Sequence, residues 1–212
     1  MGITATVQSS DIQLQQAFDA FSSAELAKTA LFGEERVAYA AALRDTFEQY
    51  RSSEHGSLLC VRDILSLSSR TPYVGYAGDQ ALTIEMPADA DDEMLGTGAL
   101  QVLDASRQMM LDFLSGRLRA LERDEGMAFH QTQMSDLSAR CGFRNVAAML
   151  KAARSVALTR AADTGVTTVS PLRRVKADYF EGMGADFDVG VPSGCGSAIL
   201  GRSIREALAH CA

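Results

Sequence analysis

Apolar side chains recur at every third or fourth position through long stretches of the chain, and this spacing is typical of amphipathic helices. The clearest case is residues 34–51, where one stripe contains Val37, Ala40, Leu43, Phe47 and Tyr50. The longest predicted helix covers residues 99–123, and further helices are predicted at 11–32, 57–68 and 197–210. The pattern therefore favours a body that resembles a helical bundle.

A period of two residues, which is typical of strands, occurs only in short segments. Leu82, Ile84 and Met86 alternate with polar residues, and Gly78-Asp79 would join this strand to residues 73–77 in a hairpin. Other short strands are predicted at 166–170, 174–180 and 187–191. The expected fold class is mainly α with minor β: a helical body, small β-hairpins and a winged-helix-like C-terminal part.

An acidic stretch at residues 87–98 has few groups to bury, and this is typical of an exposed loop or linker. We therefore expect an acidic helical part at 1–125, with a regulatory or dimerising role, and a helix-turn-helix or winged-helix-like part at 126–212. A single domain is the alternative.

The charges are unevenly distributed along the chain. Residues 140–176 carry eight of the 20 Lys and Arg residues against one acid, Asp163, whereas the whole chain has a net charge of −7. Clustered cations repel one another unless something neutralises them. This segment therefore indicates contact with DNA or another polyanion, although a solvated or internally paired basic face gives the same pattern.

Residues 131–150 fit a helix-turn-helix, with Leu137 as a buried anchor, Ser138 where the helices meet and Gly142 in the turn. A recognition helix at 144–162 would follow, and then a hairpin with arginines near its tip, as in a winged helix. The predicted nucleic-acid-binding residues are Arg140, Arg144, Asn145, Lys151, Arg154, Arg173, Arg174 and Lys176. A DNA-binding regulatory protein is the resulting functional prediction.

Two other functions fit the sequence. A helical assembly protein, adaptor or structural subunit without catalysis needs no motif, and the long helix at 99–123 leaves room for a homodimer or another homo-oligomer. An enzyme would need Cys195 as its nucleophile, because this thiol lies in a glycine-rich turn just before a helix. The balance favours a protein that is not an enzyme.

The cysteines are too far apart for a zinc cage or a disulfide framework. No spacing of His, Cys or acidic residues indicates a metal site, and no cofactor motif is present. The N-terminal residues do not resemble a signal peptide, and no apolar run is long enough to span a bilayer. We therefore expect no membrane contact and a cytoplasmic location.

Overall fold

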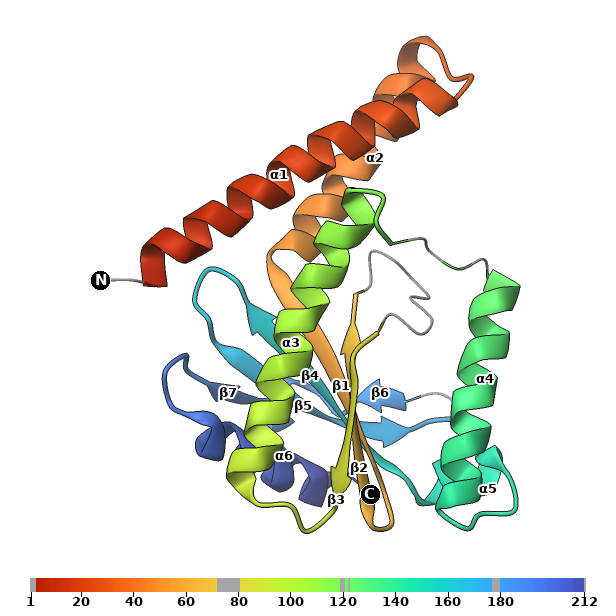
Figure 1. The fold of residues 1–212 in the computed structure, drawn as a ribbon, viewed down its shortest axis with the longest axis vertical. Coiled ribbons are helices and arrows are strands. Elements are labelled where there is room, and N and C mark those ends of the chain that lie inside the picture. The colour runs from red at the N-terminus through yellow and green to blue at the C-terminus, as the bar shows by residue number, and fades with distance from the viewer. Residues whose placement is uncertain (1–2, 72–80, 119–120, 122, 177–179, 212) are drawn as a thin grey trace.

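The computed structural model describes residues 3–71, 81–118, 121, 123–176 and 180–211. Within these residues, seven strands form one antiparallel sheet, and six α-helices surround it (Figure 1). The prediction of a mainly helical fold with minor β elements is therefore wrong, because the sheet is the centre of the molecule.

The strand order of the sheet is β3-β2-β1-β4-β5-β6, and β7 also pairs with β5. The strands are β1 (Ser53–Val61), β2 (Ile64–Arg70), β3 (Thr83–Pro87), β4 (Arg154–Ala161), β5 (Thr167–Arg174), β6 (Phe180–Gly182) and β7 (Val189–Val191). Because β1 pairs with β4, one sheet joins chain segments from both sides of residue 125.

The hairpin of β1 and β2 replaces the helix predicted at 57–68. Leu58 packs in the main core on one face of the sheet, whereas Val61 packs in a second cluster on the other face. Their spacing of three residues therefore does not mark one helical stripe. The turn at Arg62-Asp63 joins Val61 to its partner Ile64, with Arg62 at a φ of 49°.

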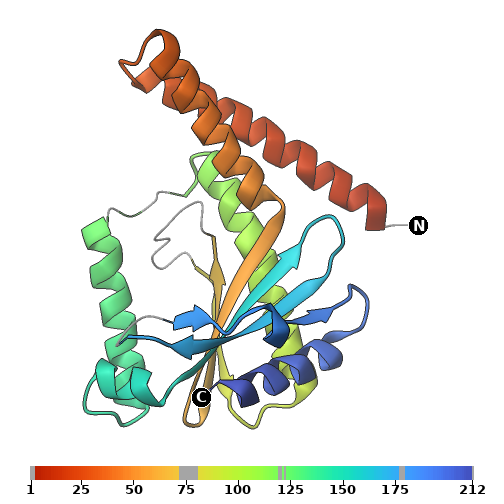
Figure 2. The same cartoon turned by 180° about the vertical axis from the view of Figure 1, so that it is seen from behind.

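One face of the sheet is covered by α3 (Asp92–Leu114) and α6 (Ser197–His210) (Figure 2). The Asp91 side chain caps α3 by accepting a hydrogen bond of 2.7 Å from the Met94 N–H, so the stretch predicted as a linker runs into this helix. The two helices cross at Gly96 and Gly201. A Cβ atom at Gly201 would lie 1.9 Å from the Asp92 carbonyl oxygen, so the crossing requires glycine.

On the other face, α4 (Arg123–Arg140) and α5 (Val146–Ala152) pack through Leu137 and Met149. The predicted corner between them is present, with Gly142 at a φ of 67° and both Leu137 and Ser138 buried. The predicted recognition helix is wrong, however, because α5 ends at Ala152. The predicted wing is also wrong, because β5 continues through Pro171.

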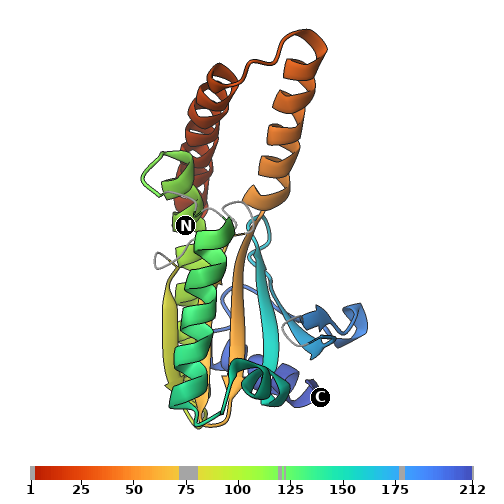
Figure 3. The ribbon, with the colours of Figure 1, turned by 90° about the vertical axis from the view of Figure 1, so that its right-hand side faces the viewer.

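The first two helices, α1 (Ile3–Lys28) and α2 (Gly33–Arg51), form an arm that projects beyond the sheet (Figure 3). At its base the rings of Phe18 and Phe47 stack with centroids 4.1 Å apart. They pack against Met110 and Leu114 near the end of α3. The helices predicted at 11–32 and 34–51 are therefore present. Of the predicted hairpin, residues 73–77 lie outside the described residues, and β3 pairs with β2.

Candidate protein-interaction surface

Several of the predicted site residues have partners within the chain. Arg140 donates two hydrogen bonds, of 2.5 and 2.7 Å, to the Glu85 carboxylate. This hydrogen bonding lowers the pKa of Glu85 and raises that of Arg140. Arg173 lies 3.5 Å from a carboxylate oxygen of Glu181, and Arg154 donates to the Leu208 carbonyl at 3.4 Å.

The other predicted basic residues gather near α5. Arg144, Lys151, Arg174 and Lys176 are exposed, and their side chains have no hydrogen bond or ion pair within the described part of the chain. Asn145 caps α5, because its side chain accepts a hydrogen bond from the Ala148 N–H. Since α5 has only seven residues and β4 begins two residues later, these cations surround a short corner instead of lining a recognition helix.

Cys195, the candidate nucleophile, is half-buried and packs against the main core just before α6. In the described residues, no group of three or more His, Cys, Asp and Glu side chains could hold a metal ion. None of the described helices is both long and apolar enough to cross a membrane. The reactivity of Cys195 and the cytoplasmic location stay predictions.

Within the described residues, no strand pairs with the outer edge of β3, and this edge exposes backbone hydrogen-bonding groups. The Ser69 N–H donates to the Leu82 carbonyl, and the Ala88 N–H donates to the Asp63 carbonyl. Because these bonds alternate along an antiparallel pair, Ile84 and Met86 also point their backbone groups toward β2. The N–H groups of Thr83 and Glu85 therefore point away from the sheet.

A hollow of about 450 Å³ opens beside this edge. Its walls are Ile84, Glu85 and Met86 of β3 and the first turns of α3, where Asp91, Glu93 and the half-exposed Met94 lie. At its far end β3 stops at Pro87, which has no N–H to donate. The edge is therefore accessible to an added chain over a short length. At the opposite edge of the sheet, β6 and β7 have three residues each.

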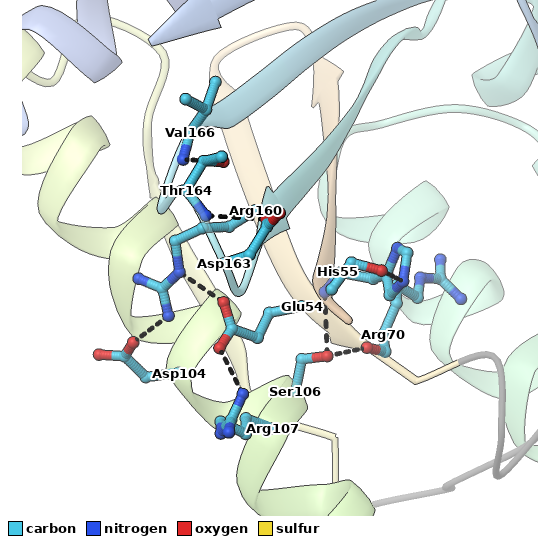
Figure 4. Close-up of polar contacts among 11 residues, drawn as sticks. Glu54, His55, Arg70, Asp104, Ser106, Arg107, Arg160, Asp163, Thr164 and Val166 are labelled. Carbon is cyan, nitrogen blue, oxygen red and sulfur yellow. Dashed lines mark hydrogen bonds and ion pairs between the residues drawn. The ribbon is translucent and has the colours of Figure 1, made fainter. Parts of the chain in front are cut away.

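Where α2 enters the sheet, a group of charged side chains occupies both faces of β1 (Figure 4). Glu54, only 6% exposed, faces α3 and pairs with Arg160 at 2.6 Å and with Arg107 at 3.4 Å. Arg160 also pairs with Asp104 at 2.5 Å. His55, the next residue, faces the other way. Sequence reasoning missed this group because it assigned no strand to residues 53–61. The available signal was in the next segment, where leucines and serines alternate at 65–68.

We expect the stability of the fold to depend on the protonation of His55. Burial lowers the pKa of His55 below its usual 6.5, and this effect outweighs the opposing charge of Glu54. The unfolded chain therefore takes up the proton at a higher pH than the folded chain does. The stability that neutral His55 contributes to the fold is fully present above about pH 6.5. It is lost as the pH falls toward the lowered pKa of His55 in the folded chain.

Urea unfolding between about pH 5 and pH 8 tests this expectation. The free energy of unfolding should fall with the pH in the acidic half of this range, and His55→Gln should reduce that fall. The other two described histidines, His130 and His210, remain in the variant and serve as its internal reference. An identical pH profile for both proteins would contradict the assignment.

A sheet with helices on both faces and an outer strand that no other described strand covers can accept an added strand from another chain. The family comparison gives the class a name. Residues 58–211 match the model of the CDI immunity protein family, CdiI, and the chain belongs to this family. The match begins within β1, so the arm of α1 and α2 lies outside it.

Solved structures support the same fold. One is the CdiA-CT/CdiI toxin and immunity complex from Yersinia pseudotuberculosis, at 16% identity and a TM-score of 0.60, covering 76% of this chain and 98% of that one. Another is a protein of unknown function from Neisseria meningitidis, at 18% identity and a TM-score of 0.58, covering 76% and 96%. No curated protein sequence matches the chain at a significant level.

These findings correct the functional prediction. A DNA-binding regulator with a helix-turn-helix is wrong, because the family is one of immunity proteins and the predicted recognition helix ends after two turns. The basic segment led to a wrong prediction of DNA binding, because the sequence does not show which of its cations form ion pairs within the chain. Arg140 and Arg160 bind carboxylates from residues far away in the first half.

Proposed function

We propose that this chain is the immunity member of a toxin–immunity pair, that it binds a CdiA-CT toxin domain and thereby blocks it, and that it is not itself an enzyme. The observation that carries the proposal is the match of residues 58–211 to the CDI immunity protein family. The fold shared with the Yersinia toxin and immunity complex supports it. The sequence predicted DNA and a second copy of the chain as partners; the partner that we propose is a toxin.

The free edge of β3 is the part of the surface that best fits such a partner. A strand added at an edge gains main-chain hydrogen bonds, and neighbouring pockets supply specificity. Thr83 and Glu85 offer the outward N–H groups, and the adjacent hollow can take side chains from the partner. Asp91 and Glu93 on its wall favour a basic segment there, since complementary charge speeds association.

A titration of the purified chain with a CdiA-CT domain from its own source organism tests the proposal. We expect a one-to-one complex, and no binding at micromolar concentrations would overturn it. The edge is tested by Glu85→Pro, which removes an outward N–H but leaves the backbone bonds to β2. Its affinity should fall at least about fivefold, because one backbone hydrogen bond is lost and the ring obstructs the edge.

Glu85→Ala is the matched control, because it also loses the ion pair with Arg140 but keeps the N–H. Its affinity should stay within about twofold of wild type, since exposed ion pairs contribute little. Equal loss in both variants would show that the carboxylate matters and the strand edge does not. Thermal unfolding of both variants confirms that the fold is retained.

A further inference from the structure

The sheet face on which α4 and α5 pack also carries a polar surface, next to the arm. His55 and Ser57 of β1 project from this face, and so do Ser68 and Arg70 of β2, because alternate residues share a face and Leu58 and Cys60 occupy the other. Figure 4 shows His55 and Arg70 together, on the opposite side of β1 from Glu54. This surface is therefore separate from the buried charge network.

The side chains of Arg70 and His55 are held in place by their neighbours. Arg70 Nε donates a hydrogen bond of 2.9 Å to the Ser57 hydroxyl, and His55 Nε2 lies 2.9 Å from the Ser53 hydroxyl. The hydroxyl of Ser106, on α3, accepts a bond of 3.0 Å from the His55 N–H and donates to the Arg70 carbonyl. The positions are thus fixed before any partner binds, which lowers the entropy cost of binding.

Arg70 has no counter-charge among the described residues. The nearby carboxylates on the other face, Glu54 and Asp104, are both engaged by Arg160, and Glu85 on this face is engaged by Arg140. Loss of surrounding water lowers the pKa of the Arg70 guanidinium. Arg70 is nevertheless exposed, so an anion from outside the chain can reach the guanidinium and supply the missing counter-charge.

We propose that Arg70, with His55 beside it, forms a subsite for a carboxylate side chain of the bound toxin. The Nη groups of Arg70 are free of described partners and can hold both oxygens of an Asp or Glu, while Nε stays on Ser57. The subsite lies on the two strands next to the edge strand, since Ser68, two residues before Arg70, pairs with Thr83 at the start of β3. The inference rests on the proposed function and names one contact within it.

Binding of the CdiA-CT domain to Arg70→Ala, Arg70→Lys and wild type tests the subsite. Arg70→Ala should weaken binding about tenfold or more, since truncation leaves the toxin carboxylate without its partner. Arg70→Lys should recover part of the loss, because a lysine keeps the charge but not the two-pronged geometry. Arg144→Ala, which removes an exposed arginine near α5, should bind like wild type.

The partner side is tested by replacing the toxin's Asp and Glu residues one at a time with Asn and Gln. One replacement should weaken binding to wild type but have no further effect on Arg70→Ala. Thermal unfolding of each variant shows whether it still folds. Ser57→Ala removes only the internal hydrogen bond from Arg70 and keeps the guanidinium, so it separates loss of this bond from loss of the contact with the toxin. If the wild type binds the toxin and Arg70→Ala binds it equally well, the subsite is overturned and the proposed function is not. Failure of wild type to bind would overturn the proposed function as well.

Discussion

Gly201→Ala is expected to destabilise the protein by about 3 kcal/mol or more, or to prevent folding. A Cβ atom at this position would lie 1.9 Å from the Asp92 carbonyl oxygen, and one at Gly96 would lie 1.8 Å from the Ser197 carbonyl oxygen. Both contacts are with backbone, so no rotamer change relieves them. The methyl group can fit only if α3 and α6 move apart, and their shared core with Leu95 and Ile204 opens.

Urea unfolding of Gly201→Ala and of the control Gly182→Ala measures this effect. An added Cβ at Gly182 meets nothing within 4 Å, so this control should change the free energy of unfolding by less than about 0.5 kcal/mol. Similar stability for the two variants would show that the helices do not cross as closely as described.

Phe47→Ala is expected to cost about 3–5 kcal/mol in the free energy of unfolding of the arm. The Phe47 side chain is fully buried, stacks on Phe18 and lies under the Arg51 guanidinium, 5.6 Å from its ring centroid. Its loss opens the small core through which the arm packs on α3. The sheet and α6 depend on a different core, so we expect the damage to stay local.

Hydrogen exchange measured on peptides distinguishes local from global loss. In Phe47→Ala, peptides from α1 and α2 should exchange faster, while peptides from α6 should keep their protection. Val37→Ala, on the same arm but at a side chain that is 70% exposed, should leave both unchanged. Loss of protection in α6 of Phe47→Ala would show that the arm and the body unfold as one unit.

The sequence predicts those helices whose apolar residues recur with a clear helical period. Residues 34–51 and 197–210 are examples, and both helices are present. The corner at Gly142 was also predictable, because a left-handed turn between two helices favours glycine. These are local preferences, and the folded structure keeps them because the tertiary contacts favour the same local conformation.

The sheet could not be predicted in the same way, because its pairings join distant residues. β1 pairs with β4 about a hundred residues later, and β4 was assigned to a helix because alanines and leucines fit both structures. β1 buries side chains on both faces, so its apolar residues lack a clean alternation.

The candidate surface was hidden for a related reason. Thr83 and Glu85 offer backbone groups, which no sequence motif records, and Arg70 follows a segment assigned to a helix. The basic segment at 140–176, by contrast, is easily seen in the sequence, yet two of its residues, Arg140 and Arg160, bind carboxylates within the chain.

The arm distinguishes this chain from the part that the family model describes. The model starts at residue 58, after α1 and α2, and yet the arm packs on α3 through Leu14, Phe18 and Phe47. The family core therefore carries an attached helical pair that has its own small core.

An immunity protein neutralises its toxin by binding it, and this is the role that we propose for the chain. The most direct measurement is the growth of cells that produce a CdiA-CT domain from the same organism, with and without this chain in matched amounts. We expect growth to be restored by the wild-type chain and much less by Glu85→Pro. Undiminished toxicity in the presence of folded, abundant wild-type chain would contradict it.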